Sequence, residues 1–287
     1  MKNALNFHEV MKNKTDKEYL ELLCRAEHED EINGVKMPGF PSVEIQTQFV
    51  GSSGATTLKG EAWTFYKLIK SNVKTYNPMG INSETKILDF GCGWGRIVRF
   101  FFKDVKSENV FGIDVDADII EICKNTLPYG DFSVCNPLSP VKFQEDSFDI
   151  IFAYSVFSHL RSDVASNWVQ EFARILKPGG LLIATTRGEW FLNHLKYLQK
   201  LRNEGGLNEH QKIIMKCFSP IEESFERYKK GEFLYEPTGG GGPRDSSFYG
   251  EAAIPREYVE SEFGKFLKFK SFADDTSLSQ SVFVMQK

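Results

Sequence analysis

The sequence has no Cys-x-x-Cys pair, and it has only five cysteines in 287 residues. Without such a pair, the usual frames of a structural zinc site or a dithiol redox centre are excluded. An odd and scattered set of cysteines also gives no disulfide framework, so reduced thiols in a cytosolic compartment are the expectation. The cysteines are Cys24, Cys92, Cys123, Cys135 and Cys217.

Long hydrophobic runs are absent as well. The N-terminal segment, Met1 to Glu18, is polar and contains lysines without an apolar core. No run elsewhere approaches the length that crosses a bilayer. The sequence therefore predicts neither export nor membrane insertion, and a cytoplasmic protein is expected.

Positive charge is not in surplus. Lys and Arg number 35 against 39 Asp and Glu, which gives a net charge of −4 and a sequence pI of about 5.8. Proteins that hold a duplex need basic residues against its phosphates. The charge balance predicts that nucleic acid is not a partner, although it does not exclude a local basic patch.

The composition that is present, 41% hydrophobic and 26% charged, is that of a folded protein. Between Thr85 and about Arg187, short apolar runs alternate with amphipathic segments, which is the pattern of β-α-β units in a parallel sheet. One decorated domain is expected for this length. It is predicted to comprise an N-terminal helical cap (1–82), a core (83–187), a helical insertion (188–247) and a C-terminal helix with strands (248–287).

The individual elements of this α/β pattern follow from their hydrophobic spacing. Core strands are expected at Lys86–Phe90, Val110–Asp114, Asp131–Val134, Phe148–Tyr154 and Leu181–Thr186. Helices are expected between these strands, and the cap is expected to contain helices at about Asp16–His28 and Ala55–Asn72. Two further strand-like segments, Phe266–Ala273 and Gln280–Gln286, are able to pair at the C-terminal end.

The most informative run follows the first core strand. Asp89 is followed by three alternate glycines, Gly91, Gly93 and Gly95. Glycine permits positive φ and close approach of a ligand to the backbone, and a helix N-terminus offers unpaired N–H donors. A dinucleotide fingerprint needs another glycine at the position of Arg96, so an NAD-linked oxidoreductase is disfavoured. The run predicts a ligand-binding loop, with an ordinary strand-to-helix turn as the alternative.

The second core strand ends at Asp114, a carboxylate that can accept hydrogen bonds from both hydroxyls of a ribose. Capping of the next helix is the alternative role, but Asp116 is the better N-cap. The glycine run and Asp114 resemble the first motif and the ribose-binding acid of class I S-adenosylmethionine-dependent methyltransferases. Ser147–Ile151 resembles the fourth-strand motif of that family, and Leu176–Gly180 resembles the turn before its fifth strand.

This resemblance implies a Rossmann-like seven-stranded sheet with the last strand antiparallel, and S-adenosylmethionine as the cofactor. Adenine is expected against Val115, with Asn136 holding its exocyclic amine. Pro137 has no N–H for the ring, so that contact is absent or comes from Leu138. The expected cofactor-binding residues are Asp89, Gly91, Cys92, Gly93, Gly95, Asp114, Val115, Asn136, Pro137, Leu138, Tyr154 and Ser155.

His159 follows the fourth core strand, at the sheet edge where open α/β sheets bind ligands, and is the candidate general base. A structural hydrogen bond to the loop is the alternative. Tyr154 and Ser155 lie at the same edge. They are expected to contact the cofactor or the substrate, with packing as the alternative role. Arg187 and Arg244 are candidates for gripping a polar substrate. The role of the glycine tract at Gly239–Gly242 is left open.

The stretches Asp89–Arg96 and Ser155–Leu160 resemble bacterial methyltransferases of surface-polysaccharide or other carbohydrate biosynthesis. We therefore expect O-methylation of a sugar, glycan or similar small polar acceptor, without a metal. An N-, C- or S-methyltransferase and a silent S-adenosylmethionine-binding module are the alternatives. The acceptor and the oligomeric state are left open, because one sheet of this kind hosts many chemistries.

Overall fold

The computed structural model describes residues 6–201, 206–275 and 278–287. The chain forms two compact units. The first contains the N-terminal part up to Cys135 together with Ser147–Phe152, and the second contains Asn136–Asp146 together with the chain from Ala153 onward. The predicted division into cap, core, insertion and closing segment stays a prediction.

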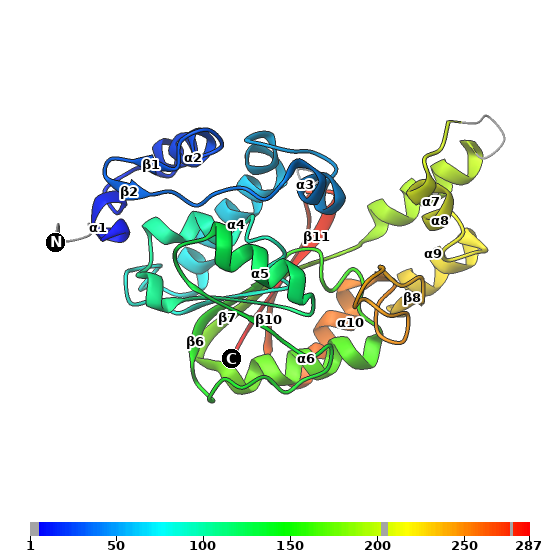
Figure 1. Ribbon diagram of the computed structural model, residues 1–287. Coiled ribbons are helices and arrows are strands. Elements are labelled where there is room, and N and C mark those ends of the chain that lie inside the picture. The colour runs from blue at the N-terminus through cyan, green and yellow to red at the C-terminus, as the bar shows by residue number, and fades with distance from the viewer. Residues whose placement is uncertain (1–5, 202–205, 276–277) are drawn as a thin grey trace. The chain divides into compact units, whose positions relative to one another are not determined.

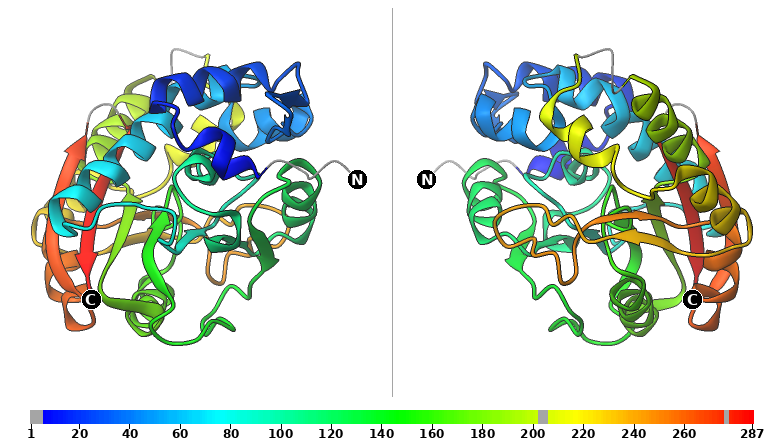
Figure 2. Two further views of the ribbon diagram at one scale, coloured as in Figure 1. Left: turned by 90° about the vertical axis from the view of Figure 1, so that its left-hand side faces the viewer. Right: turned by 90° about the vertical axis from the view of Figure 1, so that its right-hand side faces the viewer.

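The strands expected from the sequence form one seven-stranded sheet of order β10-β11-β7-β6-β3-β4-β5. Strand β3 pairs in parallel with β4 and with β6, and β4 pairs in parallel with β5. Strand β11 runs antiparallel to both β7 and β10. Figure 2 shows β10 and β11, in orange-red and red, side by side. The expected seven-stranded sheet with its last strand antiparallel is confirmed. The strands are β3 (Ile87–Phe90), β4 (Val110–Asp114), β5 (Asp131–Val134), β6 (Phe148–Ala153), β7 (Leu176–Thr186), β10 (Lys268–Asp275) and β11 (Gln280–Gln286).

The first unit carries mostly short helices, shown from blue to green in Figure 1. Thr15 begins α2 with a capping box completed by Glu18, and Asp116 caps α5 by accepting from two backbone N–H groups. The elements are α1 (Phe7–Met11), α2 (Asp16–Arg25), β1 (Glu31–Ile32), β2 (Val35–Lys36), α3 (Val43–Val50), η1 (Leu58–Ala62), α4 (Trp63–Tyr76), η2 (Val98–Lys103), η3 (Ser107–Asn109) and α5 (Ala117–Thr126).

The second unit adds α6 beside its strands and a separate group of helices after β7 (Figure 1). The apolar face of α7 packs with α9 and β8 into a small core of its own, which includes Phe191, Leu195, Phe218 and Tyr228. The elements are α6 (Ser162–Ile175), α7 (Glu189–Leu201), α8 (Glu209–Ile214), α9 (Ile221–Lys229), β8 (Leu234–Glu236), β9 (Glu251–Ala253), α10 (Arg256–Ser261) and η4 (Phe263–Lys265).

Three elements differ from expectation. The helix after the glycine run is the 3₁₀ helix Val98–Lys103 rather than an α-helix. The helix expected at Ala55–Asn72 is a π-type turn followed by α4, with a break at Gly60. Strand β7 begins at Leu176, because the backbone of Gly179 and Gly180 pairs with Lys287 at the C-terminal end. No helix in the described part of the chain is long and apolar enough to cross a membrane.

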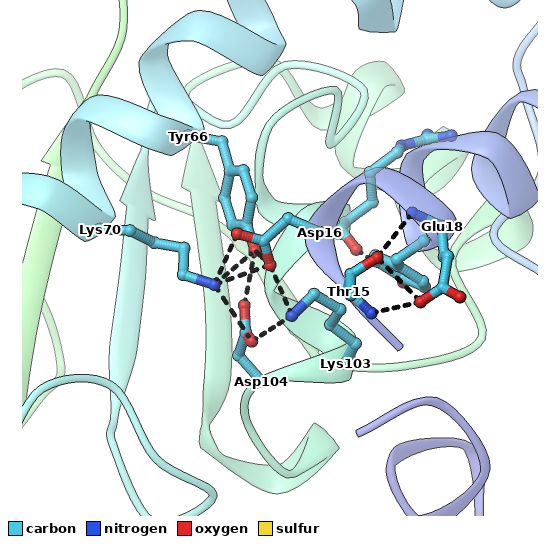
Figure 3. A network of polar contacts seen from close by, with 9 residues as sticks. Thr15, Asp16, Glu18, Tyr66, Lys70, Lys103 and Asp104 are labelled. Carbon is cyan, nitrogen blue, oxygen red and sulfur yellow. Dashed lines mark hydrogen bonds and ion pairs between the residues drawn. The ribbon is translucent and has the colours of Figure 1, made fainter. Parts of the chain in front are cut away.

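A network of charged groups ties α2 and α4 to the end of η2 (Figure 3). Asp16 accepts from Lys70 and lies 2.7 Å from the Lys103 ammonium. The Tyr66 hydroxyl lies within 2.9 Å of Asp16 and 2.7 Å of Asp104. Burial acts to raise the pKa of Asp16, but the two lysines outweigh it and hold that pKa below its ordinary value. The network therefore joins the N-terminal helices to the segment that follows the glycine run.

We expect Asp16→Asn to lower the free energy of unfolding at pH 7 by about 1 kcal/mol, because both lysines lose a charged partner. The folded-state pKa of Asp16 is lowered, so its stabilising effect is present above the unfolded pKa and is lost as the pH falls through the folded pKa. Urea unfolding at several pH values should show the variant and the wild type converging in acid. The matched control is Glu84→Gln, which removes the exposed partner of Lys106 and should change stability little. A gap that persists in acid would contradict the electrostatic account.

Candidate functional site

The glycine run forms a tight loop between β3 and η2. The backbone N–H groups of Gly91 and Cys92 both donate to the carbonyl of Ile113, at 2.8 and 3.1 Å. All three glycines have positive φ, between 51° and 75°. A Cβ at Gly95 would lie 2.2 Å from the Leu127 side chain, so a larger residue there would have to displace this leucine. The loop conformation thus depends on the glycines that the sequence singled out.

Asp114, at the end of β4, braces this loop. Its Oδ2 accepts from the Gly93 N–H at 3.0 Å, and its Oδ1 accepts from the Asp116 N–H at 3.1 Å. Asp116 makes the helix cap, as expected, so Asp114 is not needed for that role. Backbone donors thus hold both carboxylate oxygens in place, and a carboxylate, which accepts hydrogen bonds only, suits the hydroxyl donors of a ribose.

Asp89 is the second carboxylate at the loop and is 3% exposed. Burial raises the pKa of Asp89 well above its ordinary value, and the negative charge of Asp114 adds to that effect. A ligand that brings a positive charge and ribose hydroxyl donors would relieve the repulsion and satisfy the acceptors. The sulfonium and adenosine parts of S-adenosylmethionine have this chemistry, so the residues present fit the expected cofactor.

The side chains beside the loop face the interior of the first unit. The thiols of Cys92 and Cys123 lie 3.6 and 3.1 Å from the Gly93 carbonyl. The hydrogen bond to Cys123, together with burial, raises the pKa of Cys92 well above its ordinary value, which makes it an unreactive thiol. Val115 is half-buried after β4. Binding roles for Cys92, through its backbone, and for Val115 stay predictions.

The expected adenine residues of the second unit lie near α6. Asn136 is exposed, and the side chain of Leu138 is 53% exposed. The carbonyl of Pro137 accepts from the Trp168 indole N–H at 2.9 Å, which anchors this segment. An exposed Leu138 is available to contact a flat ring, and this role stays a prediction.

Tyr154 and Ser155 follow β6. Ser155 has a φ of 59°, a conformation that non-glycine residues adopt at a cost. Its N–H donates to Thr185 Oγ1 at 2.7 Å, and Thr185 donates in turn to Gln280 at 2.8 Å. Tyr154 is half-buried. Strained backbone held by buried partners is a common feature of ligand sites, and the roles of both residues stay predictions.

His159 lies in the turn after β6, and its backbone N–H donates to the carbonyl of Val156, three residues earlier. Its Nδ1 lies 2.7 Å from the carbonyl oxygen of Gly250, and its ring stacks on Tyr249 with centroids 4.6 Å apart and planes 6° apart. A carbonyl has no hydrogen to give, so Nδ1 must carry the proton in that contact. In the neutral imidazole this leaves Nε2 as the acceptor nitrogen, which is the tautomer a general base requires.

The two arginines predicted to meet substrate lie in different surroundings. Arg187, at the end of β7, forms an ion pair with Glu251 and lies over the Phe191 ring at 3.9 Å. Burial lowers the pKa of Arg187 to about 10, so it stays charged at neutral pH. Arg244 closes the glycine tract through its backbone, accepting from the Gly240 N–H at 2.8 Å. Since Glu251 already compensates Arg187, a substrate anion would gain less there than at an unpaired guanidinium; substrate roles for both stay predictions.

The structure thus gathers the predicted residues into two sets. Asp89, the glycine loop and Asp114 meet in the first unit, and His159 and Arg187 meet through Glu251 in the second. Sequence reasoning missed Tyr249, Glu251 and Thr185. The Gly250 contact of His159 spans 91 positions, so no local spacing pointed to these residues.

Within the ranges that the structure describes, no group of three or more His, Cys, Asp or Glu side chains is placed to hold a metal ion.

Residues 87–180 match the family model described as a methyltransferase domain. A tRNA N(3)-cytidine methyltransferase of Gallus gallus is 24% identical over 130 residues, which is 41% of this chain and 34% of that protein. A tRNA N(3)-methylcytidine methyltransferase of Schizosaccharomyces pombe is 28% identical over 132 residues, covering 39% and 40% of the two chains. The chain therefore spans between a third and two fifths of the length of these relatives.

A solved S-adenosylmethionine-dependent methyltransferase from Clostridium acetobutylicum has a similar fold. The two superpose with a TM-score of 0.50 at 13% identity, over 85% of this chain and 96% of the other. At this identity the likeness concerns the fold alone.

The family match bears out the prediction of a methyltransferase domain at residues 87–180, with S-adenosylmethionine as its cofactor. The solved structure bears out the fold alone. The prediction that nucleic acid is not a partner is wrong, because relatives of this segment are named as methyltransferases of tRNA. The physical reason is that a net charge of −4 is summed over the whole surface and says nothing of one local face.

Proposed function

We propose that the chain transfers a methyl group from S-adenosylmethionine to a hydroxyl of a sugar, glycan or similar polar acceptor. The observation that carries this proposal is the 2.7 Å contact of His159 Nδ1 with the Gly250 carbonyl, which leaves Nε2 as the proton-accepting nitrogen. A hydroxyl is a poor nucleophile until it loses its proton, so a base is most useful for this acceptor. The resemblance of Ser155–Leu160 to carbohydrate-type enzymes supports the acceptor class.

In this proposal the residues of the chain bind, align and move one proton. When bound, S-adenosylmethionine supplies a methyl group whose bond to sulfur breaks with the electron pair left on sulfur. Asp114 and the backbone of the glycine loop hold the adenosyl part. The positive sulfonium would favour the ionised form of Asp89, which burial and the charge of Asp114 otherwise disfavour. His159 Nε2 takes the hydroxyl proton as the new oxygen–carbon bond forms. Alignment and exclusion of water supply most of the rate.

A second candidate acceptor is a base of RNA, which is favoured by the tRNA methyltransferases among the relatives. The first turns of α7 offer a surface for it. Trp190 is 52% exposed and stacks on His194 with ring planes 4° apart, and Tyr197, 57% exposed, follows on the same helix face. Aromatic faces of this kind stack on unpaired bases.

The test is methyl transfer from isotope-labelled S-adenosylmethionine to separate pools of glycans with nucleotide sugars, and of total tRNA. We expect label in the carbohydrate pool with release of S-adenosylhomocysteine, and we expect the label to remain on an O-methyl monosaccharide after acid hydrolysis, where mass spectrometry identifies it. Label confined to tRNA would replace the first acceptor with the second. Binding of S-adenosylmethionine without release of S-adenosylhomocysteine in either pool would rule out both acceptors and favour the silent S-adenosylmethionine-binding module.

A further inference from the structure

His159 is enclosed by a segment that lies ninety residues further along the chain. Tyr249 stacks on the imidazole, and Gly250 provides the carbonyl that meets Nδ1. The Gly250 N–H also donates back to the His159 carbonyl at 2.8 Å, and the Ala252 N–H donates to the Ser158 carbonyl at 2.8 Å. The segment therefore holds both the ring and the backbone of His159.

Glu251 connects this segment to the end of β7. Its side chain is 7% exposed; one carboxylate oxygen pairs with Arg187, and the other lies 3.8 Å from His159 Nδ1. The backbone reinforces the link, because Arg187 forms a β-bridge with Ala253 and its carbonyl accepts from Ile254. A buried carboxylate is costly unless it is paired, and here it faces one permanent cation and one ring that becomes a cation on protonation.

The glycine tract Gly239–Gly242 packs against Tyr249. A Cβ at Gly240 would lie 2.6 Å from the Tyr249 ring, and the Gly239 N–H donates to the Tyr249 carbonyl at 3.1 Å. A Cβ at Gly250 would lie 2.0 Å from the Glu236 carbonyl. The absence of side chains at Gly240 and Gly250 allows the tract and β8 to press Tyr249 and Glu251 onto His159.

We infer that Glu251 is a positioning residue for His159: its charge adds to the Gly250 carbonyl in favouring the proton on Nδ1, and it stabilises the positive charge that forms when Nε2 accepts a proton. The inference rests on the proposed role of His159 as the base. Arg187 compensates Glu251 before the proton moves, which keeps the carboxylate from drawing a proton onto the resting imidazole. The charged and titratable groups that face His159 and its ion pair are Glu251, Arg187, Tyr249, His194 and Cys217.

A double-mutant cycle tests this role. We expect Glu251→Gln to lower kcat about tenfold and to leave KM for S-adenosylmethionine within about twofold, since it acts on the base alone. In a His159→Ala background the same change should lower kcat by less than about twofold. Glu251→Asp, which keeps the charge, should recover part of kcat. The matched control is Glu236→Gln on the paired strand β8, which should keep wild-type kcat.

Two outcomes would overturn the inference. One is wild-type kcat in Glu251→Gln while His159→Ala is impaired, and the other is a full additive loss in the double variant. If His159→Ala is itself unimpaired, the proposed base fails instead, so the two failures are distinguishable. Nitrogen-15 NMR of the imidazole gives a readout that does not need turnover. The Nδ1–H tautomer should dominate in the wild type and in Glu251→Gln, because the Gly250 carbonyl is kept in both. The doubly protonated ring should form at higher pH in the wild type than in Glu251→Gln, which lacks the carboxylate that stabilises the cation; the same titration in both proteins would also overturn the inference.

Discussion

Replacing His159 with alanine should lower the turnover number on the order of a hundredfold or more, because a general base contributes roughly 10²- to 10⁴-fold. The affinity for S-adenosylmethionine should stay within about twofold, since the proposed base touches the acceptor proton and not the cofactor. The geometry behind this expectation is the 2.7 Å contact that holds the proton on Nδ1. Single-turnover kinetics with labelled cofactor, alongside calorimetric binding, measures both quantities.

The matched control is His194→Ala on α7. Burial, with the nearby charge of Arg187, lowers the pKa of His194, and its partner is the Trp190 ring and not a backbone carbonyl. For a hydroxyl acceptor the control should keep most of its turnover. Unchanged turnover in His159→Ala would remove it as the base and leave it with the structural role that the sequence also allowed.

Replacing Asp114 with alanine should raise the dissociation constant of S-adenosylmethionine about a hundredfold. Two hydrogen bonds from ribose hydroxyls to a charged acceptor contribute about 3 kcal/mol together, and tenfold in affinity corresponds to about 1.4 kcal/mol. The variant also frees the Gly93 N–H that Asp114 holds at 3.0 Å, which adds to the loss. Titration calorimetry with S-adenosylhomocysteine should show the same change, because the adenosine part is common to both.

The control for Asp114 is Asp116→Asn. Asparagine caps a helix as well as aspartate does, so α5 should form and the affinity should stay near that of the wild type. Circular dichroism should show that both variants keep their helices. An unaltered dissociation constant in Asp114→Ala would overturn the ribose assignment.

The sheet was predictable because its strands are short apolar runs whose boundaries depend on local sequence. Val110–Asp114, Asp131–Val134 and Gln280–Gln286 have the bounds expected. The start of β7 was missed because Lys177–Gly180 reads as a helix stop, and its pairing with Lys287 joins segments over a hundred positions apart. Where a distant partner decides the conformation, local propensity does not reveal it.

The candidate site likewise has a part that was predictable from the sequence and a part that was not. The glycine loop and Asp114 were identifiable because positive φ, a strand end and a helix start are encoded within a few residues. The residues that surround His159 were not, because Tyr249 and Glu251 belong to a segment about ninety positions away that no spacing connects to it. The glycine tract, whose role the sequence left open, is explained by the Tyr249 ring that occupies the space beside Gly240.

The central claim is that the loop from Asp89 to Gly95, with Asp114, holds the adenosyl sulfonium. Isothermal titration calorimetry of the wild-type chain with S-adenosylmethionine and with S-adenosylhomocysteine tests it most directly. The account predicts saturable heat with one site per chain for each compound, and competition between the two. Absence of heat with both compounds would contradict it.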